Sequence, residues 1–275
     1  MITINNNMYV LDTDNTSYAF AVLGSGQLEH LYYGRKLHAN EAVMTEKHTF
    51  IPGNTNVYNK DYSSYSLEDV CLEMSSLGKG DIREPFIEVT YPNGSSTTDM
   101  VFDRAEIIQG KEEYDTLPGS YDDNGEVEQL VIYLKDRNYN LTLELHYYVY
   151  EKCDIITRSA KLVNSGNESV RLERLMSMQL DLNESDYELS FFNGAWAREM
   201  NRSRIPIRAG KYVNESVTGT SSNRANPFFM IGRSSTTEDY GECYGFNLIY
   251  SGNHYEAAQV NSYGKLRLVS GINPA

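Results

Sequence analysis

The one tryptophan of this chain lies in a short polar run that could present side chains to a ligand. Trp196 stands in the segment Asn-Gly-Ala-Trp-Ala-Arg-Glu that begins at residue 193, so Arg198 is two residues away. An indole ring offers a flat apolar face, and a guanidinium offers a planar set of donors. Asn226 lies further along, in a second small polar segment over residues 221–228. We predict ligand contacts at these three side chains; the alternative for Trp196 is a ring that fills a β core.

A second group of candidates lies in and beside residues 40–79, which lack regular alternation and predict a long irregular insertion. Asp69, Glu73 and Asp81 could supply carboxylates, and cleavage of a glycosidic bond needs two carboxyl groups about 5–10 Å apart. No particular pair stands out, and a solvated acidic loop is the simpler interpretation. Arg83 follows a Gly-rich bend and could recognise a polar ligand. The alternative for Arg83 is an internal ion pair that fixes the loop against a sheet.

Other catalytic patterns are absent from the sequence. It contains no Gly-rich phosphate loop, no Gly-x-Ser-x-Gly elbow and no His-Glu-x-x-His motif. The five histidines are scattered, and the three cysteines have neither a disulfide framework nor a zinc-ligand spacing. The sequence therefore predicts no cofactor and no metal.

The charge balance excludes two classes of partner. The chain has 38 acidic and 24 basic residues, a formal net charge of -14. Such a field repels nucleic-acid phosphates and anionic lipid surfaces. No apolar run approaches the roughly 18 residues that cross a bilayer, and the first residues do not resemble a secretory signal. We expect a cytoplasmic protein with neither a nucleic-acid nor a membrane partner.

The elements that would position these side chains are β-strands, because almost every strong hydrophobic signal has a period of two. Val170–Leu182 is the longest example, with apolar residues mostly at even positions and polar residues such as Gln179 and Asp181 at odd, wetter positions. This strand and the three before it predict a four-stranded antiparallel meander. The other expected strands are Met8–Leu11, Tyr18–Leu23, Leu28–Tyr33, Ile87–Tyr91, Phe228–Gly232, Cys243–Tyr250, Ala257–Asn261 and one that starts at Leu266. We predict an all-β fold with two large stacked antiparallel sheets and a single domain over residues 1–275.

Several short motifs, taken in order and spacing, resemble the N-terminal domain of bacterial family 36 glycoside hydrolases, the α-galactosidase family. The resemblance covers nearly the whole chain. Its motifs are Gly80–Pro85, Asp154–Ser159 with Arg171–Arg174, Gly194–Glu199, Ser221–Ser222 with Asn226–Phe228, Gly241–Phe246 and Tyr250–Asn253.

This resemblance implies a galactose-mutarotase-like β-supersandwich that packs on a separate (β/α)₈ catalytic barrel. Family members release terminal α-linked galactose from sugars of the melibiose and raffinose type, with retention of configuration, and use two aspartates of the barrel. The Lys-x-Asp-x-Asn pattern of the nucleophile is absent here, so no catalytic residue is expected in this chain. The implied partners are the barrel, further copies in a homo-oligomer and α-galactosides. The resemblance makes Trp196, Arg198, Asn226, Asp69 and Arg83 candidates for the rim of the active site.

Two other functions compete with this interpretation. A free-standing carbohydrate-binding module would need an exposed aromatic platform and sugar affinity of its own. An aldose 1-epimerase, which shares the supersandwich architecture, would need a histidine and a glutamate that converge on one concave sheet. The scattered histidines, including His146 and His254, give the epimerase little support.

Overall fold

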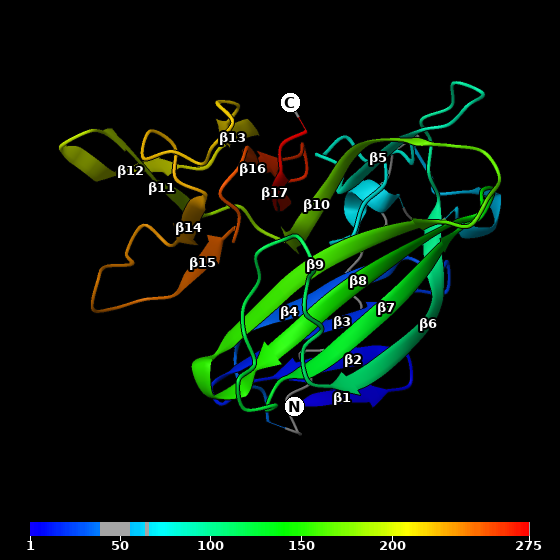
Figure 1. The fold of residues 1–275 in the computed structure, drawn as a ribbon, viewed down its shortest axis with the longest axis horizontal. Helices are drawn as coiled ribbons and strands as arrows, with labels where there is room; N and C mark the ends of the chain where they lie inside the picture. Colours follow the sequence, from blue (N-terminus) through cyan, green and yellow to red (C-terminus); the bar gives the residue numbers. More distant parts are fainter. Residues whose placement is uncertain (39–55, 64–65, 275) are drawn as a thin grey trace.

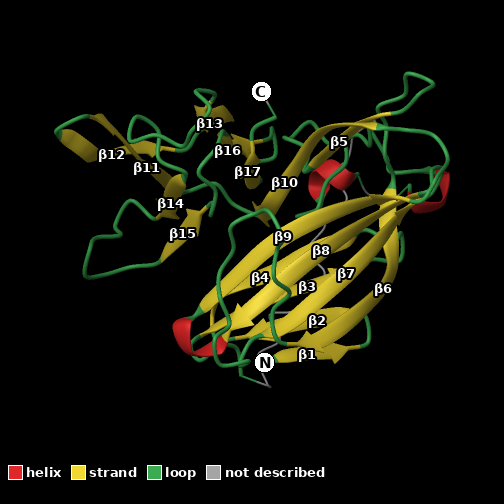
Figure 2. Ribbon diagram, viewed as in Figure 1, coloured by secondary structure: helices red, strands yellow, loops and turns green. Residues whose placement is uncertain are grey.

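The computed structural model describes residues 1–38, 56–63 and 66–274. Within these residues the chain forms β-strands and three single turns of 3₁₀ helix, so the all-β prediction is confirmed (Figure 2). None of the described helices is long or apolar enough to cross a membrane. The strands are β1 (Ile2–Asn5), β2 (Met8–Asp12), β3 (Thr16–Val22), β4 (Leu28–Arg35), β5 (Ile87–Thr90), β6 (Met100–Gln109), β7 (Glu128–Asp136), β8 (Leu141–Tyr150), β9 (Ile155–Asn164), β10 (Arg171–Leu182), β11 (Glu188–Ala195), β12 (Arg198–Pro206), β13 (Gly210–Ser216), β14 (Phe228–Gly232), β15 (Cys243–Asn247), β16 (His254–Val260) and β17 (Leu266–Ile272). The 3₁₀ turns are η1 (Lys60–Tyr62), η2 (Leu67–Asp69) and η3 (Glu151–Cys153).

The described strands form four antiparallel sheets. Their strand orders are β1-β2-β3-β4, β6-β7-β8-β9, β13-β16-β17-β10-β5 and β12-β11-β14-β15. Figure 1 shows the sheet β6–β9 in front of the sheet β1–β4, with the other two sheets beside this pair. One apolar core takes residues from all four sheets, among them Phe20, Ile132, Leu268 and Ile231. Stacked sheets therefore bury the apolar faces that the alternation predicts.

The sheet β6–β9 shows how alternation builds this core. Ile132 of β7 is fully buried and pairs with Leu145 of β8, so the two strands present their apolar residues to the same side. On β8, the buried residues Leu141, Leu143 and Leu145 follow the predicted period of two.

The meander prediction is correct for three of its strands and wrong for the fourth. β7, β8 and β9 pair in sequence order, and β6 completes their sheet. β10 instead pairs with β5 on one edge and β17 on the other. Alternation along a strand shows which residues face a core, but it does not show which strands supply the hydrogen bonds at the edges.

The prediction of a wetter face on β10 is wrong for the second half of the strand. Gln179 and Asp181, at the odd positions, are both 0% exposed. Gln179 accepts a hydrogen bond from Ser75 and donates one to the carbonyl of Leu72, so the segment before β5 covers this face. This half of the polar face is therefore buried through hydrogen bonds rather than apolar contacts, whereas Arg171 at the start of β10 is exposed.

The described part of the predicted insertion is irregular, as expected, but it is not a solvated loop. Residues 39–55 and 64–65 lie outside the described residues. Leu67 and Leu72 join a small apolar cluster with Tyr58, and Asp69 and Glu73 are 1% and 0% exposed. The expectation of a solvated acidic loop is therefore wrong for these two carboxylates, because the segment packs into the fold.

Candidate functional site

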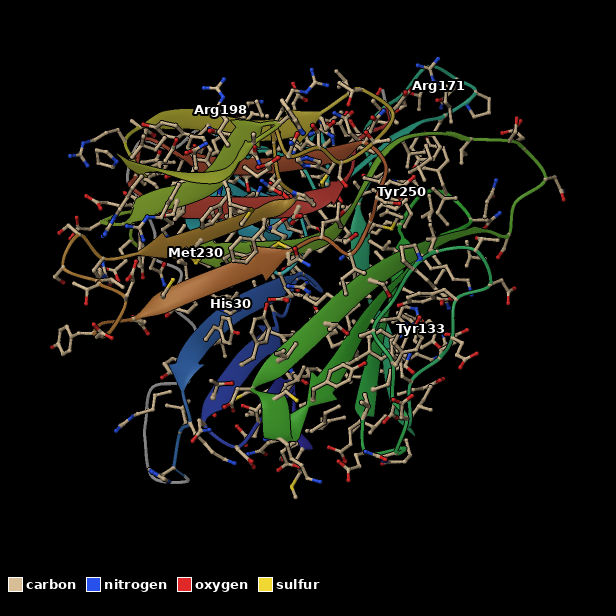
Figure 3. All side chains as sticks on the ribbon, turned by 60° about the vertical axis from the view of Figure 1, so that its left-hand side comes forward. His30, Tyr133, Arg171, Arg198, Met230 and Tyr250 are labelled. Carbon is tan, nitrogen blue, oxygen red and sulfur yellow. The ribbon has the colours of Figure 1, made fainter. Side chains whose placement is uncertain are left out.

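Trp196 lies at the tip of a hairpin and not in a core. β11 and β12 pair up to Ala195 and Arg198, which leaves Trp196 and Ala197 as the turn. The indole is 90% exposed, and Ala197 has a φ of 60°, in the left-handed region. Figure 3 shows Arg198 on the outer side of this hairpin. The structure therefore brings Trp196 and Arg198 together on an exposed tip.

Asn226 is close to this hairpin in the fold, but most of its polar groups are used internally. Its backbone N–H and its Nδ2 both donate to the carbonyl of Phe192, at 3.0 Å each. The backbone carbonyl of Asn226 accepts a hydrogen bond from Asn214 Nδ2 at 2.8 Å. Asn226 thus fixes the segment after β13 against β11.

Arg83 and Asp69 lie inside the molecule, away from any open rim. Arg83 is 2% exposed and donates to Asp81 and to the carbonyls of Leu67 and Val70. These contacts form the internal ion pair that was the alternative for Arg83. The backbone carbonyl of Asp69 accepts from the buried ammonium of Lys265.

Arg83 belongs to a buried cluster of two arginines and two aspartates. Arg267 contacts both Asp181 and Asp81 at 2.7 Å, and Arg83 lies 3.1 Å from Asp181. Burial acts to raise the pKa of Asp81, but the guanidinium groups of Arg267 and Arg83 outweigh it and lower that pKa. The cluster ties the segment before β5 to β10 and β17, so its role is structural.

A groove of about 880 Å³ lies between β9 and β15, beside the loop of residues 111–120. Several aromatic side chains line it. They include Tyr18, Tyr33, Tyr114, Tyr150, Phe246 and Tyr250. Ile155 and Ile249, also in the lining, are 51% and 44% exposed. A groove of this size and composition is typical of binding sites for small molecules or polypeptide segments.

A buried carboxylate lies beneath this groove. Glu73 accepts from Tyr18 at 2.5 Å and Tyr147 at 2.9 Å, and it pairs with His30 at 3.2 Å and Arg158 at 3.0 Å. Burial acts to raise the pKa of Glu73, but Arg158 and His30 reverse this and lower it. Tyr18 and Arg158 also line the groove, so this cluster holds part of its wall in place.

The described lining of the groove does not supply a pair of carboxylates. Among the described residues that line it, Glu112 is the one carboxylate, whereas a glycosidase uses two. His146 also lines the groove, but its ring nitrogens contact Gln129 and Glu144. Burial lowers the pKa of His146. The described residues contain no group of three or more side chains placed to hold a metal ion.

The model of the glycosyl hydrolase family 36 N-terminal domain matches residues 26–275. The chain belongs to this family. The similarity extends to individual proteins of known sequence. Alpha-galactosidase AgaA of Geobacillus stearothermophilus is 35% identical over 270 residues, which are 96% of this chain and 36% of the relative. The bifunctional alpha-galactosidase/sucrose kinase AgaSK of Mediterraneibacter gnavus is 33% identical over 98% of this chain and 29% of the relative.

Solved structures of the family have the same fold. The alpha-galactosidase of Lactobacillus brevis matches with a TM-score of 0.92 and 36% identity, over 98% of this chain and 37% of that protein. AgaB of Geobacillus stearothermophilus matches with a TM-score of 0.94 and 32% identity, over 100% of this chain and 38% of that protein. The family 36 N-terminal domain described here therefore spans between 29% and 38% of the length of these relatives.

The sequence motifs identify the family, and some of their residues, such as Arg158 and Phe246, line the groove. None of the site residues predicted from the sequence does so. The Glu73 cluster joins side chains from five separate segments, whereas the sequence pattern groups Glu73 with a solvated loop. The apolar residues Leu72 and Met74 on either side of Glu73 are both buried, and they are the signal that could have indicated its burial.

Proposed function

We propose that this chain is the non-catalytic N-terminal part of an α-galactosidase. The whole enzyme would hydrolyse terminal α-galactosides of the melibiose and raffinose type with retention of configuration, and its catalytic aspartates would lie in a separate barrel domain. The observation that carries this proposal is a groove, in a chain of this family, whose described lining contains one carboxylate. Crystal structures of AgaA variants with raffinose and with stachyose support the substrate class.

The role of the domain would be to pack on the barrel and to support a homo-oligomer. The exposed apolar side chains along the groove, such as Ile155 and Ile249, support a surface that another polypeptide covers. One apolar core that draws on all four sheets supports a single domain over residues 1–275. The cytoplasmic location stays a prediction.

The hairpin tip is the candidate for the rim of the active site. Trp196 is 90% exposed and Arg198 lies beside it, so both side chains are available to a sugar or to the barrel. Asn226 would act by fixing β11, and Asp69 and Arg83 would act by holding the interior in place.

The test is an assay of the 275-residue chain with an aryl α-galactoside, beside a calorimetric titration with melibiose. We expect neither turnover nor binding, while the same chain joined to a family 36 barrel domain hydrolyses the substrate. Turnover by the chain alone would overturn the proposal.

A carbohydrate-binding module is the second candidate, and the exposed indole of Trp196 favours it. Melibiose binding by the isolated chain, lost in Trp196→Ala and retained in Trp196→Phe, would support the module. Both variants should unfold at the same urea concentration as the parent chain, because the indole has almost no contacts to lose.

A further inference from the structure

Two ionisable side chains on β16 are buried with polar atoms that face each other. His254 and Glu256 are two residues apart on one strand, so they point to the same face. They are 0% and 2% exposed. Among the described residues, neither His254 Nδ1 nor Glu256 Oε1 has a hydrogen-bond partner, and the two atoms are 3.7 Å apart.

The remaining atoms of the pair determine where protons can lie. His254 Nε2 is 2.9 Å from the carbonyl of Ala225, which can only accept, so Nε2 carries the hydrogen. Nδ1 of a neutral imidazole is then an acceptor. Glu256 Oε2 accepts from Asn214 Nδ2 at 2.6 Å. A hydrogen on Glu256 Oε1 would therefore give both unpartnered atoms a partner, after a small approach of the two groups.

The surroundings favour the neutral form of this pair. Glu256 lines a cavity of about 160 Å³ together with Phe191, Phe229 and Leu189 of the facing sheet. In the described part of the chain, Glu256 has no lysine or arginine partner. Glu215 of β13 is the charged neighbour that acts on His254, and it favours the imidazolium. Burial raises the pKa of Glu256 to about 8 and lowers that of His254.

Hydrogen bonds connect both side chains to the same surface segment, residues 222–226. His254 Nε2 donates to the backbone carbonyl of Ala225. Asn214 Nδ2 donates both to Glu256 Oε2 and to the backbone carbonyl of Asn226, the latter at 2.8 Å. Asn226 in turn donates twice to Phe192 of β11. A chain of hydrogen bonds thus runs from the buried carboxyl to the strand that leads to Trp196.

We propose that Glu256 and His254 form a proton latch. One proton shared between Glu256 Oε1 and His254 Nδ1 holds residues 222–226 against β16 and β11. Its loss to solvent at alkaline pH leaves a buried carboxylate without a cation, facing the lone pair of His254 Nδ1. Repulsion between these two atoms displaces His254 from the carbonyl of Ala225 and releases the segment. The latch is independent of the groove and of the proposed galactosidase function.

The sign of the pH dependence follows from the raised pKa. The folded protein holds a proton that the unfolded chain has lost above the ordinary pKa of 4.5. The stabilisation is complete below that value and disappears as the pH rises through about 8. The ionised fraction of Glu256 would increase roughly 25-fold between about pH 6.5 and pH 8.5.

Tryptic cleavage after the exposed Arg224 measures release of the segment. The 275-residue chain is compared with Glu256→Gln at each pH, which cancels the pH dependence of trypsin. The amide of Gln can donate permanently to His254, so we expect the ratio of cleavage rates, wild type to variant, to increase by up to roughly 25-fold over this range. The control Glu238→Gln, at a carboxylate that is 86% exposed and outside this chain of hydrogen bonds, should behave like wild type.

A ratio that does not change with pH would overturn the latch, and so would a Glu238→Gln variant that behaves like Glu256→Gln. Carbon-13 NMR of the wild-type Glu256 carboxyl gives a second readout that needs no variant. A titration midpoint near 8 supports the proposal, and a midpoint near 4.5 contradicts it even if Glu256→Gln does not fold.

Discussion

Glu73 shows how a single carboxylate can hold side chains from distant parts of the sequence. Tyr18, His30, Tyr147 and Arg158 all contact it, and it is 0% exposed. A buried charge is tolerated only when it is paired and hydrogen-bonded. Removal of the charge of Glu73 would leave the guanidinium of Arg158 buried without its carboxylate.

We expect Glu73→Gln to lower the free energy of unfolding by about 3–5 kcal/mol, the usual cost of breaking a buried ion pair. Urea denaturation, monitored by circular dichroism, measures this change in the free energy of unfolding. Glu126→Gln is the matched control, because Glu126 forms an exposed pair with Lys152 and such pairs contribute about 0–1 kcal/mol. Equal effects of the two substitutions would contradict the assignment of Glu73 as a buried anchor.

The lowered pKa of Glu73 also predicts an acid effect. A carboxyl whose pKa is lower in the folded state contributes stability above its ordinary pKa of 4.5, and this is lost as the pH falls through the folded value. At acid pH, the free energy of unfolding of Glu73→Gln should therefore fall less steeply with decreasing pH than that of wild type. An unchanged slope would show that Glu73 is not ionised in the folded protein.

At the scale of elements, the β11–β12 hairpin depends on a glycine two residues before Trp196. A Cβ on Gly194 would overlap the backbone carbonyl of Arg198 across the hairpin. We expect Gly194→Ala to destabilise the protein by about 1–3 kcal/mol, as overpacking does. Ala197→Gly is the control: Ala197 has a φ of 60°, which glycine adopts without strain. The free energies of unfolding of the two variants, measured by urea denaturation, should therefore differ clearly.

The four-residue ionic cluster joins two strands to the segment before β5. Arg267→Met leaves Asp181 and Asp81 with Arg83 alone, and we expect a loss of about 3–5 kcal/mol. In Arg267→Met with Asp181→Asn, one positive and one negative charge are removed together, so the double variant should be more stable than the sum of the two single effects predicts. A double-mutant cycle from urea denaturation measures this coupling, and strict additivity would contradict it.

At the scale of the whole molecule, the sequence predicts where the strands lie better than it predicts which strands pair with each other. Phe228–Gly232 is predicted with the bounds that β14 has, because alternation is a local signal. The pairing of β10 with β5 and β17 does not follow from the sequence, since it joins residues far apart along the chain. Burial of Asp181 and Glu73 is missed for a related reason: a polar residue is buried only when distant partners, such as Arg267 for Asp181, satisfy it.

The net charge and the apolar groove together predict how the isolated chain behaves in solution. A charge of -14 keeps copies apart at low ionic strength, and salt screens that repulsion, with a Debye length of about 10 Å at 0.1 M. We expect self-association through the groove that increases with salt, measured by sedimentation velocity. Ile155→Lys, on the groove, should reduce it. Ile108→Lys is the control with the same charge change, at a position on β6 that is 42% exposed and outside the groove lining. If both variants associate equally, the groove is not the contact surface.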